Sequence, residues 1–276
     1  MKKVGIIFNP MVEAAGALAG ELERYLAGAG VSSWSCSSWE LAEIRPEVSG
    51  TDLVLSVGGD GTILRAVQAV IATKTPITGI NLGKLGFMTE LAADEALNRL
   101  PEILDGAGWL DERAMLEAQI TGNGGEGKIY YALNDVVVAR GAIARLVSVE
   151  ASVDDEPLTV YRADGVMVAT ATGSTGYALA AGGPVLSPEV TELLLLPILP
   201  HLSLSYPLVL PARAVVSLRV STAYRATLSV DGNINLPLES GALITVKRSQ
   251  VITRFWRIHP RASFYRSLEQ KLKGKK

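Results

Sequence analysis

The sequence is poor in the residues that build disulfides and metal clusters. It has one cysteine, Cys36, and two histidines among 276 residues. A single cysteine excludes a disulfide within the chain and argues against a structural zinc cluster. Positive and negative charges nearly balance, since the chain has 26 Lys and Arg and 28 Asp and Glu. Such a balance offers no long-range attraction to nucleic acid or to an anionic membrane, so local donors must hold any anionic ligand.

Long hydrophobic runs are also missing. The longest, Leu193–Leu199, is too short to span a bilayer and contains Pro197. The N-terminal stretch reaches Gly5 and Asn9-Pro10 too early for a signal peptide, so we expect a cytoplasmic protein. Apolar residues make up 48% of the chain, which supplies a sizeable core. Its length exceeds that of one compact core and favours two domains.

The first part of the chain, residues 1–110, alternates between apolar runs and amphipathic stretches. The apolar runs predict strands at Val4–Phe8, Asp52–Val57 and Pro76–Leu82. The amphipathic stretches predict helices at Glu13–Ala29, Thr62–Ala72 and Glu95–Leu104. This alternation predicts an α/β domain with a parallel sheet.

Residues 111–250 are dominated by short β-type runs separated by turns rich in Gly, Asp and Pro. The runs predict strands at Glu117–Thr121, Lys128–Ala132, Asp135–Ala139, Val147–Val153, Leu158–Tyr161, Val166–Ala169, Val215–Val220, Ala226–Val230 and Leu243–Arg248. We expect a mainly β domain with one helix starting near Ser174. The last segment, residues 251–276, returns to helical spacing at Ser263–Lys273, and we expect it to fold back on the first domain.

The most distinctive motif is Gly58-Gly59-Asp60-Gly61-Thr62, directly after a predicted strand. Glycines let backbone N–H groups approach a phosphate closely, and a helix starting at Thr62 would direct its positive end at an anion. The motif is not a dinucleotide fingerprint, because Leu64 stands at the third glycine position. It is not a Walker A loop either, because no Gly-Lys-Ser/Thr follows.

Asp60 is the unusual member of this motif, since a carboxylate repels phosphate oxygens. It would hold a divalent cation or accept a proton from an attacking hydroxyl. The simpler alternative is that Asp60 caps the following helix. His201 and His259 both lie beside prolines and are expected to be structural, which leaves Asp60 as the better base. The motif therefore points to phosphoryl transfer.

Two further polar clusters lie in the β-rich part. Asn134-Asp135 precedes a predicted strand, where an Asx pair usually forms a turn but also suits ribose hydroxyls and adenine nitrogens. Another strand is flanked by Asp164-Gly165 and by the run Thr172–Tyr177. The hydroxyls of that run are either donors to a ligand or ordinary helix caps: Thr172, Ser174 and Thr175.

In order and spacing, and over nearly the whole chain, these motifs resemble the bacterial NAD kinases. The segments that carry the resemblance are Gly58–Thr62, Asn134-Asp135, Asp164-Gly165, Thr172–Tyr177, Gly182-Gly183-Pro184, Pro200-His201, Pro207–Val209, Asp231-Gly232 and Phe264-Tyr265. The first motif is shared with diacylglycerol and sphingosine kinases and resembles that of phosphofructokinases. The Thr-Gly-Ser-Thr block together with Asn-Asp is more specific.

The resemblance implies a Rossmann-like α/β domain, a β-sandwich-like domain, and ligand bound between them. It implies transfer of phosphate from ATP, or from polyphosphate, to the 2′-hydroxyl of the adenosine ribose of NAD, with Mg²⁺ and with Asp60 as general base. It also implies a homodimer or homotetramer. The implied nucleotide-binding residues are Gly58, Gly59, Gly61, Thr62, Arg65, Phe87, Asn134, Asp135, Arg145, Arg162, Asp164, Thr172, Thr175, Gly176, Tyr177, Ala178, Leu179, Ala180, Leu199 and Asn233.

Within the resemblance, Phe87 would lie against the adenine, and Leu199 would touch a ligand across a subunit interface. The chain departs from the family pattern at five positions: Asp135 for Glu, Ala171 for Pro, Gly176 for Ala, Tyr206 for Arg and Asn233 for Gln. No departure removes a group that the chemistry needs.

Two rival functions remain open. A lipid kinase of the diacylglycerol type shares the first motif, but the chain has no evident amphipathic segment for membrane binding. An NAD-sensing protein would keep the pocket without catalysis, and the presence of Asp60 argues against it. The sequence leaves open the phosphate donor, the choice between NAD and NADH, feedback by NADPH, the subunit number and the metal ligands.

Overall fold

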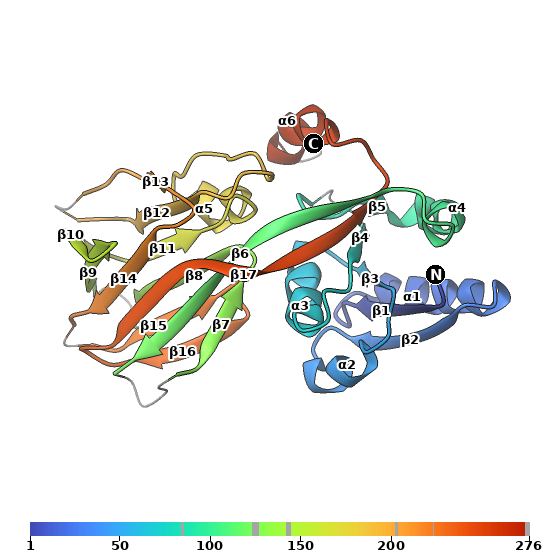
Figure 1. Cartoon of the computed structure of the whole chain (residues 1–276), viewed down its shortest axis with the longest axis horizontal. Helices are drawn as coiled ribbons and strands as arrows, with labels where there is room; N and C mark the ends of the chain where they lie inside the picture. Colours follow the sequence, from blue (N-terminus) through green and yellow to red (C-terminus); the bar gives the residue numbers. More distant parts are fainter. Residues whose placement is uncertain (84–85, 123–126, 142–144, 202–203, 223, 274–276) are drawn as a thin grey trace. The chain divides into compact units, whose positions relative to one another are not determined.

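The computed structural model describes residues 1–83, 86–122, 127–141, 145–201, 204–222 and 224–273. The chain divides into two compact units (Figure 1). The first, called the α/β unit, consists of Met1–Glu112 and Thr253–Lys276, and the second, called the β unit, of Arg113–Ile252.

The α/β unit contains a parallel sheet with the strand order β2-β1-β3-β4, and β5 pairs with β4. The strands are β1 (Lys3–Phe8), β2 (Ser32–Ser37), β3 (Leu53–Val57), β4 (Ile77–Asn81) and β5 (Leu91–Ala92). The helices are α1 (Glu13–Gly28), α2 (Leu41–Glu47), α3 (Asp60–Val70), α4 (Ala93–Leu104) and α6 (Ser263–Lys273). The end of β17 joins this sheet, where Phe255 pairs with Ile77.

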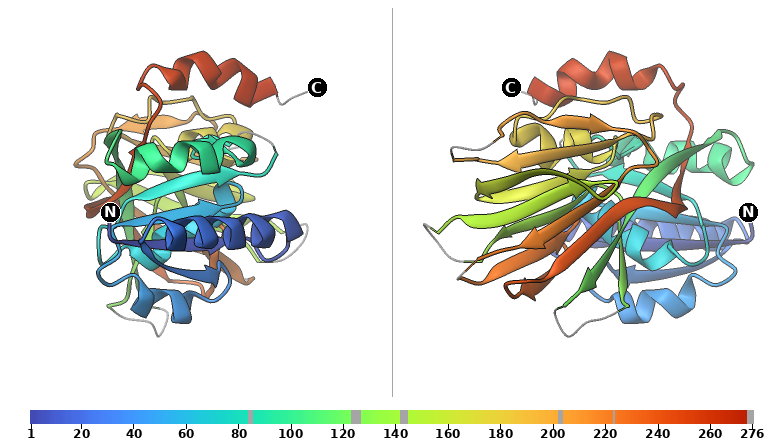
Figure 2. Two further views of the ribbon diagram at one scale, coloured as in Figure 1. Left: turned by 90° about the vertical axis from the view of Figure 1, so that its right-hand side faces the viewer. Right: turned by 60° about the vertical axis from the view of Figure 1, so that its left-hand side comes forward.

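Burial on both faces of the central strands explains their continuous apolar sequences. Every residue of β3 and of β4 is buried, as expected for parallel strands covered on both faces. Helices α1 and α4 pack on one face, with Leu22 and Leu100 in the core. Helix α3 packs over β3 and β4, and its Ile63 lies against Gly79. Figure 2 shows these helices beside the strands, in blue to green.

The β unit is built from two mostly antiparallel sheets. One has the order β10-β9-β14-β17, with β6 beside β17 and β7 beside β6, and Figure 1 shows β6 and β17 running side by side. Its strands are β6 (Trp109–Thr121), β7 (Ile129–Ala132), β9 (Val147–Val153), β10 (Glu156–Ala163), β14 (Val215–Val220) and β17 (Leu243–Arg257). The other sheet has the order β13-β12-β11-β8-β15-β16. Its strands are β8 (Asp135–Arg140), β11 (Gly165–Ala169), β12 (Leu193–Ile198), β13 (Leu208–Leu210), β15 (Ala226–Val230) and β16 (Ile234–Leu238).

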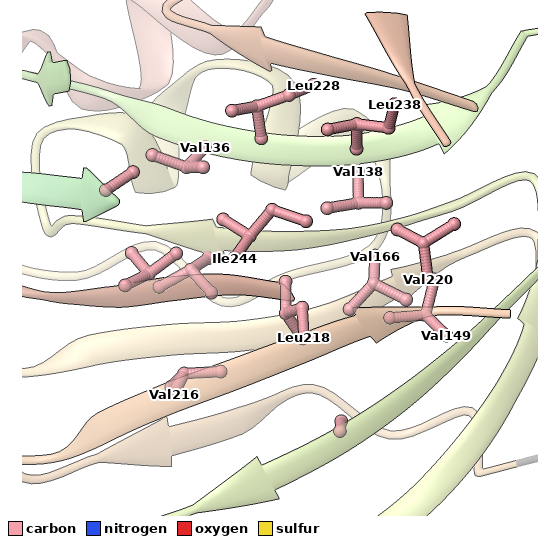
Figure 3. Packing of buried hydrophobic residues seen from close by; sticks show 14 of the residues in the cluster. Val136, Val138, Val149, Val166, Val216, Leu218, Val220, Leu228, Leu238 and Ile244 are labelled. Carbon is pink, nitrogen blue, oxygen red and sulfur yellow. The ribbon is translucent and has the colours of Figure 1, made fainter. Parts of the chain in front are cut away.

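The two sheets of the β unit pack face to face around an aliphatic core. Val136 and Val138 of β8 point inward together with Val166 and Leu228, toward Leu218 of the opposite sheet (Figure 3). This two-residue alternation is the pattern of a β-sandwich. The predicted fold class, an α/β domain plus a β-sandwich-like domain, is therefore confirmed.

Several elements differ from the sequence expectation. Helix α3 begins at Asp60 and not at Thr62. Strands β6 and β17 are much longer than the predicted runs within them. The expected helix near Ser174 is a 3₁₀ turn at Gly173–Thr175 followed by the short α5 (Tyr177–Ala180). Within the described residues, no helix is long and apolar enough to cross a membrane.

Candidate active site

The glycine-rich motif forms the turn from β3 to α3. Gly58 has a φ of +155°, and a Cβ there would collide with the side chain of Thr62, so this position requires glycine. A Cβ at Gly59 or Gly61 would meet open space instead. The backbone at these two glycines is thus accessible to a ligand at the positive end of α3.

Asp60 does not cap this helix. The N-cap position is Gly59, and no side chain caps the helix there. The half-buried carboxylate of Asp60 faces a neighbouring loop instead, where Oδ2 accepts the N–H of Phe87 at 2.9 Å and Oδ1 accepts the N–H of Met88 at 3.1 Å. A Cβ at Gly86 would overlap this carboxylate. The fold therefore brings Phe87, a predicted site residue, beside Asp60 and fixes the orientation of the carboxylate.

Arg65, one helical turn after the motif, stacks on an aromatic ring that sequence reasoning left unassigned. Its guanidinium lies 4.4 Å from the centroid of Trp39, whose side chain is exposed. Such a cation–π pair holds both side chains at a defined place. No sequence pattern marks this contact, since the two residues come from different parts of the chain.

In the β unit, the Asn134-Asp135 turn is held by a carboxylate to which the resemblance assigned no role. Asp231, between β15 and β16, accepts three backbone N–H groups, those of Leu133 (2.8 Å), Asn134 (2.7 Å) and Asp135 (3.1 Å). The N–H of Asp231 donates in return to the carbonyl of Asp135. The conformation of the turn thus depends on Asp231.

Asp135 and Asp231 form a buried carboxylate pair, each side chain about 6% exposed. Burial, and then the charge of Asp231, raises the pKa of Asp135 to about 7. Burial also raises the pKa of Asp231, while its three backbone donors act in the opposite direction by favouring the charged form. Because those donors favour a charged Asp231, Asp135 is the member of the pair that burial keeps neutral more readily.

Two polar atoms near this pair are buried without a hydrogen-bond partner among the described residues. They are Oδ1 of Asn134 and Nδ2 of Asn233. Buried polar atoms are almost always paired, so these two are candidates for contact with a ligand. Both residues were predicted to bind nucleotide.

The Thr172–Tyr177 block packs directly on this turn. A Cβ at Gly173 would collide with the carbonyl of Asn134, and one at Gly176 would lie 3.4 Å from Nδ2 of Asn134. The hydroxyls of Ser174 and Thr175 donate to carbonyls three residues earlier, those of Ala171 and Thr172. Ser174 is fully buried, and its hydroxyl also accepts the N–H of Leu186 at 3.0 Å, so its bonds hold the local structure.

Thr172 has a partner that sequence reasoning missed. The buried Arg113 of β6 donates from Nη1 to Oγ1 of Thr172 at 3.3 Å. Asp164, another predicted site residue, forms an ion pair with Arg140 at 3.0 Å. Neither arginine belongs to a motif, so no sequence signal marked them.

The remaining predicted residues are dispersed over the β unit. Arg145 lies over the ring of Tyr224, and Arg162 is exposed. Leu199 is 74% exposed and has a φ of +46°, a strained conformation for leucine. In α5, Tyr177 and Ala180 are exposed and Leu179 is half-buried, while Ala178 points into the core. Their nucleotide contacts stay predictions.

No group of three or more His, Cys, Asp and Glu side chains that could hold a metal ion occurs in the described part of the chain. A lone carboxylate such as Asp60 nevertheless fits Mg²⁺, which is usually bound by one or two carboxylates together with substrate phosphates. The residues present thus suit a cation that arrives with a nucleotide.

Comparisons with known proteins cover the whole chain. Residues 28–107 match the family model of the ATP-NAD kinase N-terminal domain, and residues 133–258 match that of the C-terminal domain. The NAD kinase of Dehalococcoides mccartyi is 45% identical over 274 residues, which span 99% of this chain and 96% of that protein. The NAD kinase of Chloroflexus aggregans is 39% identical over 273 residues, 99% of both chains.

Two solved structures share the fold. An NAD kinase from Archaeoglobus fulgidus in complex with ATP superposes with a TM-score of 0.77 at 25% identity, covering 99% of both chains. Yeast NADH kinase complexed with NADH superposes with a TM-score of 0.85 at 24% identity, covering 99% of this chain and 87% of that one. Both family models and the full-length likeness agree with the motifs, and the chain therefore belongs to the NAD kinase family.

Proposed function

We propose that this NAD kinase family member transfers the terminal phosphate of ATP to the 2′-hydroxyl of the adenosine ribose of NAD, with Asp60 as the general base. The observation that carries the proposal is the Asp60 carboxylate, held by the N–H groups of Phe87 and Met88 beside the open Gly59 and Gly61. A fixed carboxylate next to an anion-binding helix terminus combines the two groups that this reaction needs.

The step begins when Asp60 accepts the proton of the ribose hydroxyl. The hydroxyl oxygen then forms a bond to the γ-phosphorus, the bond from that phosphorus to the bridging oxygen breaks, and ADP leaves. A general base of this kind contributes about 10²–10⁴-fold to the rate. The remaining acceleration comes from alignment of the reacting groups.

The donor phosphates would bind at the start of α3. The N-terminus of a helix favours an anion, and the absence of side chains at Gly59 and Gly61 would let the phosphates approach the backbone there. A divalent cation, Mg²⁺, would come with the phosphates, with Asp60 as the nearest carboxylate. When bound, it would neutralise negative charge that builds up on the phosphates.

The acceptor would be recognised in the β unit. The unpaired Oδ1 of Asn134 and Nδ2 of Asn233 suit the donors and acceptors of an adenosine. The Asp135 carboxylate suits ribose hydroxyls. The other predicted contacts, from Asp164 to Leu199, are part of the same proposal.

Four further properties complete the proposal. The two compact units act as the two expected domains, with boundaries near residues 110 and 250 and with the segment after residue 251 belonging to the first. The protein works in the cytoplasm and assembles as a homodimer or homotetramer, by analogy with the family. Inorganic polyphosphate is an alternative donor, and NADH is an alternative acceptor, as in the yeast relative.

The test is to incubate the purified chain with ATP, Mg²⁺ and NAD and to couple any NADP to an NADP-specific dehydrogenase. NADP formation supports the proposal. Phosphorylation of diacylglycerol without NADP would show the rival lipid kinase, and NAD binding without turnover would show a sensor. Replacing ATP by polyphosphate, and NAD by NADH, assigns the donor and the acceptor.

A further inference from the structure

A buried ion network lies at the end of β17, in the α/β unit. The guanidinium of Arg257 contacts Asp111 through Nε at 3.1 Å and Glu90 through Nη1 at 3.2 Å. All three side chains are only 7% exposed. Arginine is the side chain suited to such a place, because its planar fork fixes the direction of several donors at once.

The same guanidinium also reaches the loop that holds Asp60. Nη1 of Arg257 donates to the carbonyl of Met88 at 2.8 Å, and the N–H of Met88 donates to Oδ1 of Asp60 at 3.1 Å. One residue, Met88, therefore joins the ion network to the carboxylate proposed to be the base. Any shift of the Arg257 head group would displace the donor of that carboxylate.

Glu90 fixes the other end of this loop. Its N–H bonds the carbonyl of Gly79 in the sheet, and its Oε1 accepts the N–H of Ile258 at 2.8 Å and that of His259 at 2.7 Å. Glu90 thus attaches the chain after β17 through its Oε1, while its Oε2 pairs with Arg257. The distinct contribution of Arg257 is the bond to Met88.

We propose that Arg257 is a positioning residue for Asp60: through Met88 it holds the loop whose backbone N–H groups orient the catalytic carboxylate. This inference rests on the proposed function, in which Asp60 is the general base. A carboxylate turned away from the ribose hydroxyl would bind both nucleotides normally but would accept the proton slowly. Displacement of a reacting group by about 1 Å can cost about 100-fold in rate.

The first experiment compares Arg257→Met and Arg257→Lys with the matched control Arg254→Met. Arg254 lies on the same strand and pairs with Glu112 at 3.0 Å, but its side chain is 32% exposed. We expect kcat of NAD phosphorylation to fall roughly ten- to hundredfold in Arg257→Met, with the KM values for ATP and NAD unchanged. Arg257→Lys retains the charge and restores part of kcat, and Arg254→Met leaves kcat unchanged.

The second experiment separates positioning from a merely structural role. Arg257→Met is combined with Asp60→Asn, and the residual activity is measured at high enzyme concentration. If Arg257 acts through Asp60, its replacement has no further effect once the carboxylate is gone. An equal loss of rate in both backgrounds overturns the inference, as does a rise in both KM values with kcat intact.

The outcomes distinguish this inference from the proposed function. Absence of NADP formation by the unmodified chain overturns both. NADP formation together with full activity of Arg257→Met overturns only the positioning role. If Arg257→Met does not fold, Arg257→Lys replaces it in the test, because lysine keeps a buried cation beside Glu90 and Asp111. Its effect on kcat is then compared between the unmodified chain and Asp60→Asn, with the same criteria.

Discussion

Replacing Asp135 by asparagine should make the protein more stable at pH 8 while weakening its binding of NAD. The side chain is about 6% exposed, and its pKa is raised to about 7 by burial and by the charge of Asp231. An asparagine has nearly the same shape and no charge. It removes a buried charge that the fold tolerates at a cost.

The size of the effect follows from the pKa shift. A rise from 3.8 to about 7 is about three units, which corresponds to roughly 4 kcal/mol at 1.36 kcal/mol per unit. Because the folded pKa lies above the unfolded one, the folded state binds this proton more tightly. That stabilisation is fully present below about pH 4 and is lost as the pH rises through about 7. Coupling to Asp231 reduces the expected gain to about 2–4 kcal/mol at pH 8.

The assay is urea unfolding of the unmodified and Asp135→Asn proteins at pH 5 and pH 8, with the slope m as a check on two-state behaviour. Far-UV circular dichroism is the probe, because tryptophan fluorescence would report on the other unit. Asp135 lies in the β unit, whereas all four tryptophans belong to the α/β unit: Trp34, Trp39, Trp109 and Trp256. The variant should be more stable at pH 8, and its advantage should shrink to about 1–2 kcal/mol at pH 5, which still lies above the unfolded pKa of 3.8. Equal stability at pH 8 would refute the buried-charge argument. Asp155→Asn, at the exposed tip of the β9–β10 hairpin, is the control.

The remaining predictions concern the two halves of the site. Asp60→Asn should lower kcat about 10²–10⁴-fold while leaving the calorimetric Kd for NAD unchanged; unchanged turnover would remove Asp60 from the role of base. Gly58→Ala should cost about 1–3 kcal/mol in thermal unfolding, because φ is +155° and the methyl would meet Thr62. Gly59→Ala, where the methyl meets open space, should cost about 1 kcal/mol, because alanine is a poorer N-cap than glycine, and should raise the KM for ATP. Asp231→Asn should raise the KM for NAD much more than it lowers kcat, since the turn of Asn134 and Asp135 loses an acceptor; a change in kcat alone would contradict this.

Sequence patterns predicted the buried strands of the α/β unit but missed its edge. Strand β3 is a continuous apolar run with all residues buried, and it lies at the expected place. Strand β2 (Ser32–Ser37) is the last strand in the sheet order, beside β1, and is rich in serine, so it lacks the apolar signal of a covered strand. Helix α2 contains Pro46, which normally argues against a helix.

In the β unit, too, local sequence pattern failed to predict strands that contain proline or lie at a sheet edge. The apolar run Leu193–Leu199 was not predicted as a strand, and its residues Leu193–Ile198 form β12 between β11 and β13 although Pro197 lies among them. Strand β16 contains Pro237 and lies at the sheet edge, where proline is tolerated. Local pattern identifies residues that are buried on both faces, whereas edge strands depend on partners distant in sequence.

The residues of the candidate site also fall into two groups, those marked by sequence motifs and those recognised only from the fold. Motifs marked Asp60 and Asn134-Asp135, because their residue types carry the chemistry. Arg257 and Arg113 act on those motifs from distant strands, so only the fold reveals them. Asp231 was visible as a motif, but its role as the acceptor of three backbone N–H groups depends on its position in space.

Asp60 and Asp231 make the same type of hydrogen bond but differ in burial, and the difference in burial separates their roles. Asp60 and Asp231 both accept backbone N–H groups, two in the first case and three in the second. Asp231 is about 6% exposed, and its carboxylate oxygens accept the N–H groups that hold the Asn134-Asp135 turn. Asp60 is half-buried and keeps free lone pairs on an oriented carboxylate, which suits a group that must meet a substrate proton. Exposure, and not residue type, therefore favours Asp60 for proton transfer and Asp231 for the architecture that presents the acceptor.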